Sequence, residues 1–339
     1  MNLLFCSPRY DLDRLARRIA ASFSGPIIAC TTAGQLGEAG FQKGGITAVS
    51  LTSSELLVSP YLITPLAECQ ARASEAAFTA RSGLFEHGSE RAFGMVLVDG
   101  LSRAEERLAA SLYQSLGTIP LIGGCAGDQL SFEGTYVYHE GKFLRDAALF
   151  ALFETTLPFT TFKVQHTHPG KHKLVVTMAD PEQRLVHEFN GEPAAEAYAE
   201  ALGVEVDELD ALFFAKNPVI FQSGGEHYVR SIKSLGADFG LVFFSGLEVG
   251  QVLSVGDGID EVQALQRGFD AVRDKIGTPQ VILGCDGTRY RSGVERDDTD
   301  ARLSALMARN AVAGFSSYGQ QYNALYVNQT FSAVALSGA

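Results

Sequence analysis

Short runs of apolar residues alternate along the chain with longer stretches in which apolar positions recur every three or four residues. The short runs predict buried strands, and the longer stretches predict amphipathic helices. Strands are expected over residues 1–6, 26–30, 46–51, 93–98, 147–154, 159–164, 174–178, 240–244, 280–284, 312–315 and 331–336. Helices are expected over residues 11–19, 66–82, 102–116, 194–202, 261–276 and 299–308.

One helix carries a recognisable start signal. Ser102 precedes it and Glu105 follows three residues later, which is the pattern of a capping box. We therefore expect Ser102 to cap the helix that runs to Leu116.

One pattern occurs three times: an apolar strand, then small residues, then a glycine and a polar side chain. It is found at residues 27–35, 121–129 and 313–320, and a further apolar strand follows each time, at residues 46–51, 147–152 and 331–336. Glycine allows sharp turns and close approach of neighbouring backbone. The repeat favours a recurring structural turn in duplicated sheets, and the alternative is a set of loops that line a ligand site.

The succession of strands and helices predicts an α+β protein with two related halves, residues 1–160 and 161–339. Hairpin-like strand pairs favour mixed and antiparallel sheets, packed as an αββα sandwich with the helices outside. A simple Rossmann sheet is the alternative.

Composition narrows the functional classes. The 339 residues are 46% hydrophobic and 19% charged, which is typical of a protein with an ample core. The formal charge of −12 disfavours nonspecific binding to nucleic acid or to an anionic membrane. No apolar run is long enough to span a membrane, and the start lacks the features of a signal peptide. The five cysteines are scattered and unpaired in sequence, so we expect free thiols in a cytoplasmic protein.

The stretch from Gln165 to Lys173 holds three of the seven histidines, His166, His168 and His172. In an extended segment His166 and His168 would share a face and could bind one divalent ion, as in a metal hydrolase. A haem site requires fewer protein ligands than such a metal site, namely one axial imidazole, together with an apolar pocket and partners for the propionates. A histidine-rich surface loop is the remaining interpretation, and the residues alone leave all three open.

Other candidate chemistry is weaker. The sequence has no nucleophile elbow and no phosphate-binding glycine loop. Cys30 and Cys125 are expected to be small buried residues. Arg289 and Arg291 follow a predicted strand and could meet an anion, with surface ion pairs as the alternative.

Several motifs resemble the FIST family. The glycine-rich stretch 28–34 is similar to the FIST N-terminal region, and residues 190–195, 314–320 and 327–331 are similar to the FIST C-terminal region. The resemblance covers nearly the whole chain. It implies a signal-input module that binds a small ligand, divided into an N-terminal domain over 1–160 and a C-terminal domain over 161–339, and it implies no enzyme activity.

Residues 173–181 and 184–191 resemble the NosP branch of this family, whose members are haem proteins that sense nitric oxide. The resemblance implies haem b, with His166 as first choice for the iron ligand and His168 as second. Thr167 and the run 285–288 depart from the pattern of the branch. The other residues that it places near haem are His172, and, for the propionates, Lys171, Lys173, Arg289 and Arg291.

The same resemblance implies regulation in trans of a partner enzyme, either a histidine kinase or a diguanylate cyclase or phosphodiesterase. A homodimer is compatible with it. The alternatives are a FIST sensor for another small ligand, such as an amino acid, without haem, and a metal hydrolase with histidine ligands.

Overall fold

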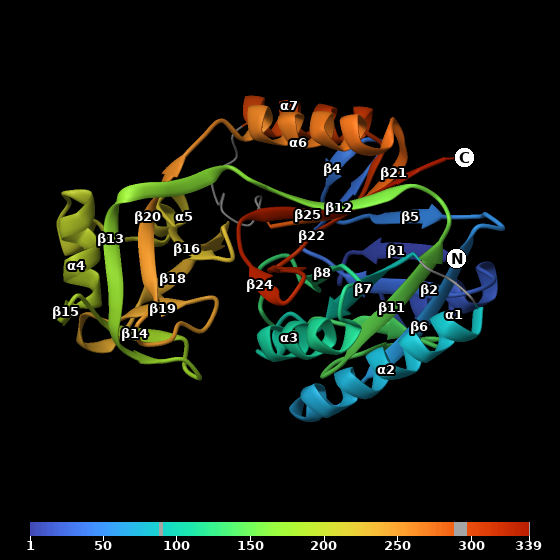
Figure 1. Cartoon of the computed structure of the whole chain (residues 1–339), viewed down its shortest axis with the longest axis horizontal. Helices are drawn as coiled ribbons and strands as arrows, with labels where there is room; N and C mark the ends of the chain where they lie inside the picture. Colours follow the sequence, from blue (N-terminus) through green and yellow to red (C-terminus); the bar gives the residue numbers. More distant parts are fainter. Residues whose placement is uncertain (88–90, 288–296, 339) are drawn as a thin grey trace.

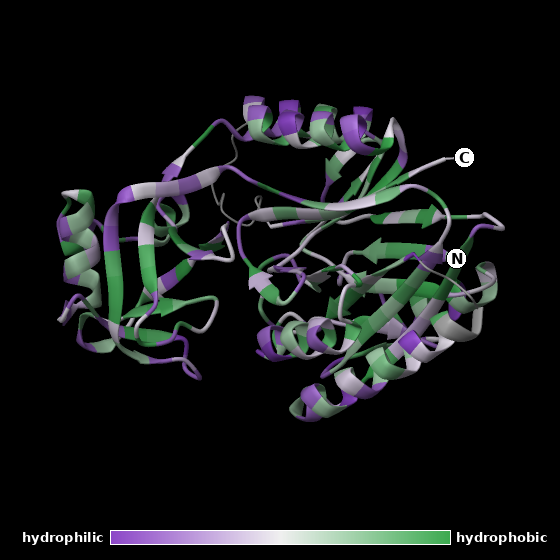
Figure 2. Cartoon of the chain, viewed as in Figure 1, coloured by the Kyte–Doolittle hydropathy of each residue, from purple (hydrophilic) through white to green (hydrophobic). Residues whose placement is uncertain are grey.

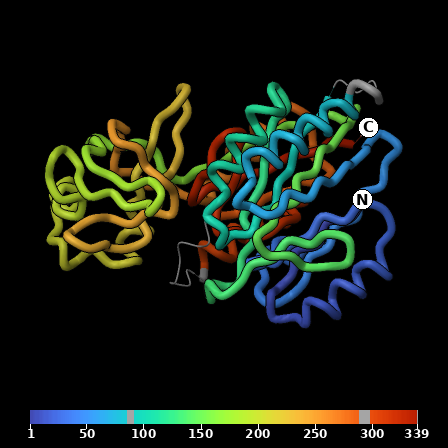
Figure 3. The backbone as a smooth tube through the Cα atoms, turned by 90° about the horizontal axis from the view of Figure 1, so that it is seen from below, coloured from blue at the N-terminus to red at the C-terminus, as the bar shows by residue number. Residues whose placement is uncertain are grey.

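The computed structural model describes residues 1–87, 91–287 and 297–338, which form a large body and a smaller lobe beside it (Figure 1). The body takes residues 1–165 and the described residues after 258, and the lobe takes residues 166–258. The two parts are also distinct in the perpendicular view (Figure 3). The chain therefore leaves the body once, builds the lobe, and returns.

Within the described residues, the body repeats one unit three times. Each unit has a strand, a helix, a second strand parallel to the first, a hairpin, and a last strand antiparallel to the first. The helix is needed because parallel strands cannot be joined by a tight turn.

The elements of the first unit are β1 (Asn2–Cys6), α1 (Leu12–Ser22), β2 (Ile27–Thr31), β3 (Gly34–Gly37), β4 (Gly40–Gln42) and β5 (Ile46–Ser50). Those of the second are β7 (Ala92–Val98), α3 (Glu105–Leu116), β8 (Leu121–Cys125), β9 (Val137–His139), β10 (Lys142–Leu144) and β11 (Ala148–Thr155). Those of the third are β21 (Pro279–Asp286), α7 (Asp297–Arg309), β22 (Val312–Ser316), β23 (Gln320–Tyr322), β24 (Leu325–Val327) and β25 (Thr330–Ser337). The motif that recurs in the sequence marks the same turn in each unit.

The units exchange their hairpins in a cycle. The β9–β10 hairpin of the second unit pairs with β2 of the first, and the β23–β24 hairpin of the third pairs with β8 of the second. The β3–β4 hairpin of the first unit completes the cycle by pairing with β22 of the third. Each unit therefore extends the sheet of another.

Three backbone hydrogen bonds close this cycle where the second strands end. The amides of Ala33, Gly127 and Tyr318 donate to the carbonyls of Ser316, Thr31 and Cys125, over 3.0, 3.0 and 3.4 Å respectively. These positions are equivalent in the three units. In each unit, the amide of the residue before the donor also donates a hydrogen bond, to the carbonyl of the last residue of that unit's first strand. We call these three bonds the closing ring.

A strand and a helix precede the second and third units. They are β6 (Leu56–Ile63) with α2 (Cys69–His87), and β12 (Phe159–Gln165) with α6 (Glu261–Ile276). β6 pairs antiparallel with β11, and β12 pairs antiparallel with β25. A short turn through the 3-10 helix Leu66–Glu68 joins β6 to α2, whereas the whole lobe lies between β12 and α6. The lobe is therefore an insertion, and the predicted domain boundary at 160/161, which stays a prediction, falls in the strand that leads into it.

The body core lies between the sheet of the second unit and the sheets of the other two. Phe93 stacks on Phe153 at 4.6 Å between ring centroids, and Phe5 stacks on Phe315 at 4.8 Å. Helices α2 and α3 cover one outer face, and α1, α6 and α7 cover the other. Figure 2 shows apolar strands inside and hydrophilic residues on the outer helices. The predicted α+β class, with mixed and antiparallel sheets and helices outside, is confirmed.

The lobe is a curled sheet with its own core. Its strands run in the order β17-β16-β20-β13-β14-β19-β18, and the large buried side chains are Tyr198, Phe189 and Phe214. The strands are β13 (Thr167–Asp180), β14 (Leu185–Phe189), β15 (Glu192–Pro193), β16 (Val219–Ser223), β17 (Glu226–Arg230), β18 (Ile232–Leu235), β19 (Leu241–Phe243) and β20 (Val252–Gly258). The helices are α4 (Ala194–Leu202), α5 (Ala211–Lys216) and the 3-10 turns Val206–Glu208 and Ala237–Phe239.

The predicted capping box at Ser102 is wrong. Helix α3 begins at Glu105, and its preceding residue Ala104 caps no amide with a side chain. The Ser102 hydroxyl instead donates to the Asp99 carbonyl and accepts from the Ala104 amide. Glu105 does not reach back to the helix start because its carboxylate is 2.7 Å from Arg184 in the lobe.

Two expectations from composition can be compared with the structure. All five cysteines are buried and free, and burial raises the pKa of Cys30 and Cys125 well above the usual thiol value. These two thiols are therefore packing residues and not exposed nucleophiles. Among the described residues, no helix is both long and apolar enough to cross a membrane.

Candidate functional site

The chain passes from body to lobe at His166, which lies between β12 and β13. The returning chain passes beside it, because the Ile259 amide donates to the His166 carbonyl over 2.7 Å. His166 therefore lies where both connections between body and lobe meet.

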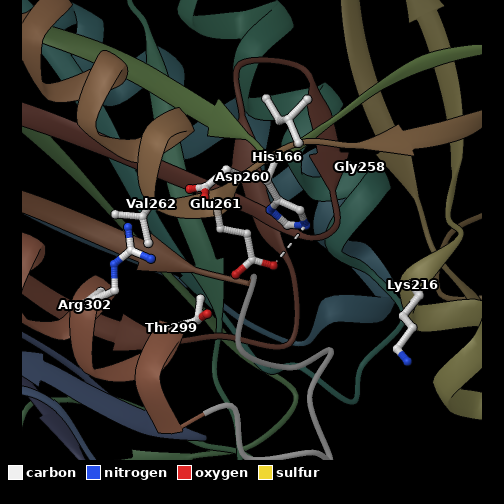
Figure 4. A pocket seen from close by; sticks show the side chains of 9 residues that line it. His166, Lys216, Gly258, Asp260, Glu261, Val262, Thr299 and Arg302 are labelled. Atoms are coloured by element: carbon white, nitrogen blue, oxygen red, sulfur yellow. Dashed lines mark ion pairs between the residues drawn. The ribbon is translucent and has the colours of Figure 1, made fainter.

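The His166 side chain is buried and faces a carboxylate. Its Nε2 lies 3.8 Å from Glu261 Oε1, and the two side chains are 4% and 15% exposed. Glu261 is the first residue of α6, and Asp260 caps this helix by accepting from the Gln263 amide at 2.8 Å. The rigid start of α6 thus fixes the carboxylate in front of the imidazole (Figure 4).

These side chains line a cavity of about 360 Å³ between the lobe and the α6–α7 side of the body. Lys216 at the end of α5 contributes from the lobe, and Thr299 and Arg302 contribute from α7 (Figure 4). The volume is in the range of small-molecule sites. Two cations and two carboxylates face the same space, so the cavity suits a polar ligand with groups of both signs. The residues that line it are His166, Lys216, Gly258, Ile259, Asp260, Glu261, Val262, Thr299 and Arg302.

Of the predicted site residues that the structure describes, His166 alone lines this cavity. His168, Lys171, His172 and Lys173 are exposed along β13. The Lys173 ammonium donates to the Ser254 hydroxyl over 2.5 Å, across to β20. Arg289 and Arg291 lie outside the described residues.

The predicted pairing of His166 with His168 depends on an extended segment through both. His166 instead falls in the bend before β13, so the two side chains differ in environment: one is buried and the other exposed. Across the described ranges, no three His, Cys, Asp or Glu side chains are grouped as metal ligands.

Sequence reasoning missed most of the cavity. The amphipathic pattern predicts the helix 261–276, and the acidic pair Asp260-Glu261 is a normal helix start. Nothing in that pattern distinguishes a capping acid from one that faces a histidine. The approach of Lys216 and Arg302 depends on the insertion of the lobe, which no local signal reports.

Haem needs one axial imidazole, an apolar pocket and cations near its propionates. His166 supplies an imidazole at the cavity wall, and Lys216 and Arg302 supply the cations. The Glu261 carboxylate lies on the Nε2 side, where an iron would bind. The residues therefore supply the imidazole and the cations that haem needs, whereas Ile259 and Val262 are the apolar side chains of the lining, and Glu261 is the group that would have to turn aside.

A second contact between body and lobe is ionic. The Arg184 guanidinium lies 2.7 Å from Glu105 Oε1 and 3.6 Å from Glu106 Oε2, both on α3. It also donates to the Phe244 carbonyl over 2.7 Å, and the Gly246 amide donates to Glu106 over 2.9 Å. We call this cluster the ionic contact. A cavity of about 580 Å³, lined in part by Glu106 and Arg184, lies beside it.

The charges of the ionic contact shift one another. Burial acts to lower the pKa of Arg184, but the carboxylates of Glu105 and Glu106 and the hydroxyl of Tyr326 outweigh it, so the pKa is raised. Burial raises the pKa of Glu106 despite the opposing effect of Arg184. The cation is therefore firmly held, whereas Glu106 is the group that protonates more readily.

Two further residues join body and lobe. Arg230 is buried in the lobe and donates to the Tyr326 carbonyl of the body over 2.6 Å. Lys163 on β12 lies 2.9 Å from Glu226 on β17 and donates to the His227 carbonyl over 2.7 Å. The lobe is thus joined to the body by polar contacts in addition to the ionic contact.

Comparison with known families gives matches over nearly the whole chain. The FIST N domain profile matches residues 1–192, and the FIST C domain profile matches residues 194–323. The two matches meet between β15 and α4, inside the lobe. Among curated proteins, the chain is similar to the uncharacterized protein MJ1623 of Methanocaldococcus jannaschii, with 31% identity over 109 residues. That match covers 32% of this chain and 21% of the relative, so it spans about a fifth of the relative's length.

Proposed function

This chain belongs to the FIST family, whose domains are sensory modules of signal transduction, and we propose that it senses nitric oxide through haem held beside His166. The observation that carries the proposal is the buried His166 imidazole at the wall of a cavity where the lobe joins the body. FIST domains are sensory and not catalytic, which fits a chain that regulates a partner enzyme instead of acting as one.

In this proposal His166 would hold the haem iron, and Lys216 and Arg302 would hold the propionates. Haem would supply an iron with an open position for a diatomic ligand. Glu261 would leave the imidazole and turn towards solvent. The Asp260 cap keeps α6 in place during this change, because it depends on the Gln263 amide and not on His166.

A change at His166 would reach the lobe by a short path. His166 directly precedes β13, and its carbonyl holds Ile259 of the returning chain. A displacement of His166 would therefore alter both connections between body and lobe at once. The lobe would then move relative to the ionic contact on its other side. Ligand binding would favour one of two positions of the lobe relative to the body. We propose that a histidine kinase or a cyclic-di-GMP enzyme, acting in trans, reads this arrangement.

The visible absorption spectrum tests the proposal. Protein expressed with a haem supply is expected to show a Soret band that shifts when nitric oxide is added. His166→Ala should lose most of the bound haem, whereas His168→Ala, at an exposed position two residues away, should retain it. Haem that survives His166→Ala and is lost in His168→Ala would reverse the assignment, and purified protein without a Soret band would contradict the proposal.

A second candidate follows from the charges of the same cavity. Asp260 and Glu261 line it together with Lys216 and Arg302, and charges of both signs are what a zwitterion such as an amino acid requires. Haem-free protein titrated calorimetrically with single amino acids would then bind one of them. Arg302→Met should weaken that binding by about tenfold or more, since a charge-assisted hydrogen bond is lost. Binding that is unchanged in Arg302→Met would exclude this use of the cavity.

A further inference from the structure

The sheets of the three units match strand for strand, except at one edge. In the second unit the order is β6-β11-β7-β8-β23-β24, and in the third it is β12-β25-β21-β22-β3-β4. In the first unit the order is β5-β1-β2-β9-β10. Among the described residues, no strand pairs with the outer edge of β5, where the other units carry β6 and β12.

The free edge of β5 can be assigned residue by residue. Met1 and Leu51 exchange backbone hydrogen bonds of 3.0 Å, and the Ser7 amide donates to the Gly45 carbonyl over 3.0 Å. Backbone groups alternate in direction along an antiparallel strand, so residues 45, 47, 49 and 51 face β1. Ile46, Ala48 and Ser50 therefore direct their N–H and C=O groups to the open side.

The outer face of β5 is also uncovered. Ile46, Ala48 and Ser50 are exposed, and Ile46 is 38% accessible. The equivalent strands β11 and β25 are buried along nearly their whole length, because α2 and α6 lie over them. Helix α1 covers the sheet of the first unit at β1, β2 and β9, through Leu4, Ala29 and Tyr138. The β5 edge is thus open in the sheet plane and above it.

We propose that this edge is a docking surface for a second copy of the chain, with β5 pairing antiparallel to β5 of its partner about a two-fold axis at Ala48. The other units supply the template, since β6 and β12 are both antiparallel to the strands on which they lie. Two copies of one strand related by a two-fold axis meet in this same orientation. The outward groups fix the register: Ile46 pairs with Ser50 of the second copy, and Ala48 pairs with its own equivalent.

The strand itself is suited to self-pairing. Residues 46–50 are Ile, Thr, Ala, Val and Ser, without charge and without proline. The ladder with β1 runs without a register shift. Edge strands that avoid association carry lysine, proline or a bulge, and β5 has none of these. An uncharged strand also brings no like charges together when it meets its own copy, in spite of the acidic charge of the whole chain.

Sedimentation equilibrium over about 1 to 100 μM protein tests the proposal, a range that covers ordinary dimer affinities. The natural chain is expected to form dimers as concentration rises. Ala48→Pro removes an outward N–H and leaves the β1 ladder intact, so it should raise the dissociation constant by about tenfold or more. Ile46→Lys should also weaken the dimer, because a lysine on an edge strand opposes pairing with another strand, and Ala48→Val, which keeps the N–H, should not. Circular dichroism confirms that each variant is folded.

Cross-linking gives an independent test of the proposed β5 pairing. The native cysteines are all buried, so Ala48→Cys places the reactive thiol at the proposed axis. Directly opposed residues in a hydrogen-bonded pair have Cα atoms about 5.5 Å apart, which permits a disulfide. Mild oxidation should give a covalent dimer with Ala48→Cys, and little with Ala110→Cys, an exposed position on α3. A chain that stays monomeric at the highest concentration overturns the proposal. A dissociation constant that is unchanged in both edge variants also overturns it. Equal cross-linking at the two cysteine positions does so as well.

Discussion

Arg184 in the lobe and Glu105 at the start of α3 form a 2.7 Å ion pair between side chains that are 12% and 2% exposed. The pair lies apart from His166, so the lobe is fixed to the body at its root and again at the ionic contact. Any movement of the lobe in signalling must keep or exchange this pair.

Replacing Arg184 is expected to destabilise the chain strongly. Arg184→Met leaves Glu105 buried without its cation, and breaking a buried pair in this way costs about 3–5 kcal/mol. The free energy of unfolding in urea measures the loss. Arg72→Met is the control: it breaks an exposed pair with Glu68 (43% and 60% exposed) and should cost less than about 1 kcal/mol. Equal losses in the two variants would show that the ionic contact does not stabilise the fold.

The raised pKa of Glu106 makes stability depend on pH. A carboxyl whose pKa is higher in the folded state contributes stability that is fully present below its unfolded value of 4.5 and is lost as pH rises through the folded value. Glu106→Gln keeps an acceptor for the Gly246 amide but does not titrate. The free energy of unfolding of the natural chain, relative to this variant, should therefore fall as pH rises above 4.5. Parallel pH curves for the two proteins would contradict this expectation.

The Asp128 carboxylate joins the second and third units, and replacing it is expected to destabilise the chain. Its carboxylate accepts from the amides of Phe132, Glu133 and Gly134 over 2.7 to 3.0 Å, and from the Tyr318 hydroxyl of the third unit. Asp128→Asn turns one acceptor into a donor that faces donors, which should cost about 1–3 kcal/mol in urea unfolding at neutral pH.

The pH dependence at this site has the opposite sign from that of Glu106. Burial acts to raise the pKa of Asp128, but hydrogen bonds from Tyr318 and from the loop amides outweigh it, so the pKa is lowered. The stability it contributes is present above 3.8 and is lost as pH falls through the folded value. An Asp128→Asn variant with the same acid unfolding midpoint as the natural chain would exclude this role.

Gly314 is expected to tolerate no side chain. A Cβ there would lie 1.8 Å from the Gly284 carbonyl oxygen in the parallel pair β21–β22, so the strands would have to separate. Gly314→Ala should cost about 1–3 kcal/mol or more, the range for overpacking a core. Gly258→Ala is the matched control, because its Cβ would meet no atom within 4 Å. Thermal unfolding of the two variants compares them directly, and similar midpoints would refute the steric explanation.

The sequence predicts the local parts of this fold well. Periodicity places the helix over 261–276, and the motifs at residues 27–35, 121–129 and 313–320 do mark equivalent turns. These signals are local, because each depends on residues that are neighbours along one strand or helix. The exchange of hairpins is not local: nothing in residues 34–42 indicates that they pair with β22 and not with their own unit.

The candidate site was predictable in one residue. The resemblance of residues 173–181 to the NosP branch points to His166, and the structure places this residue at the cavity. Glu261 could not be paired with it, since the whole lobe separates them in sequence. Glu105 shows the same limit from the other side: its spacing from Ser102 predicts a helix cap, but an arginine 79 residues away takes its carboxylate.

The closing ring sets an order on biosynthesis. The Ala33 amide is made early, but its acceptor at Ser316 is made only after the second unit and the lobe. Until then the β3–β4 hairpin lacks its partner β22, although domains usually begin to fold from the N-terminus during synthesis. A nascent chain of this protein therefore cannot complete the pairing of its first unit until the third unit has been made. The edge of the β3–β4 hairpin stays unpaired until β22 is made.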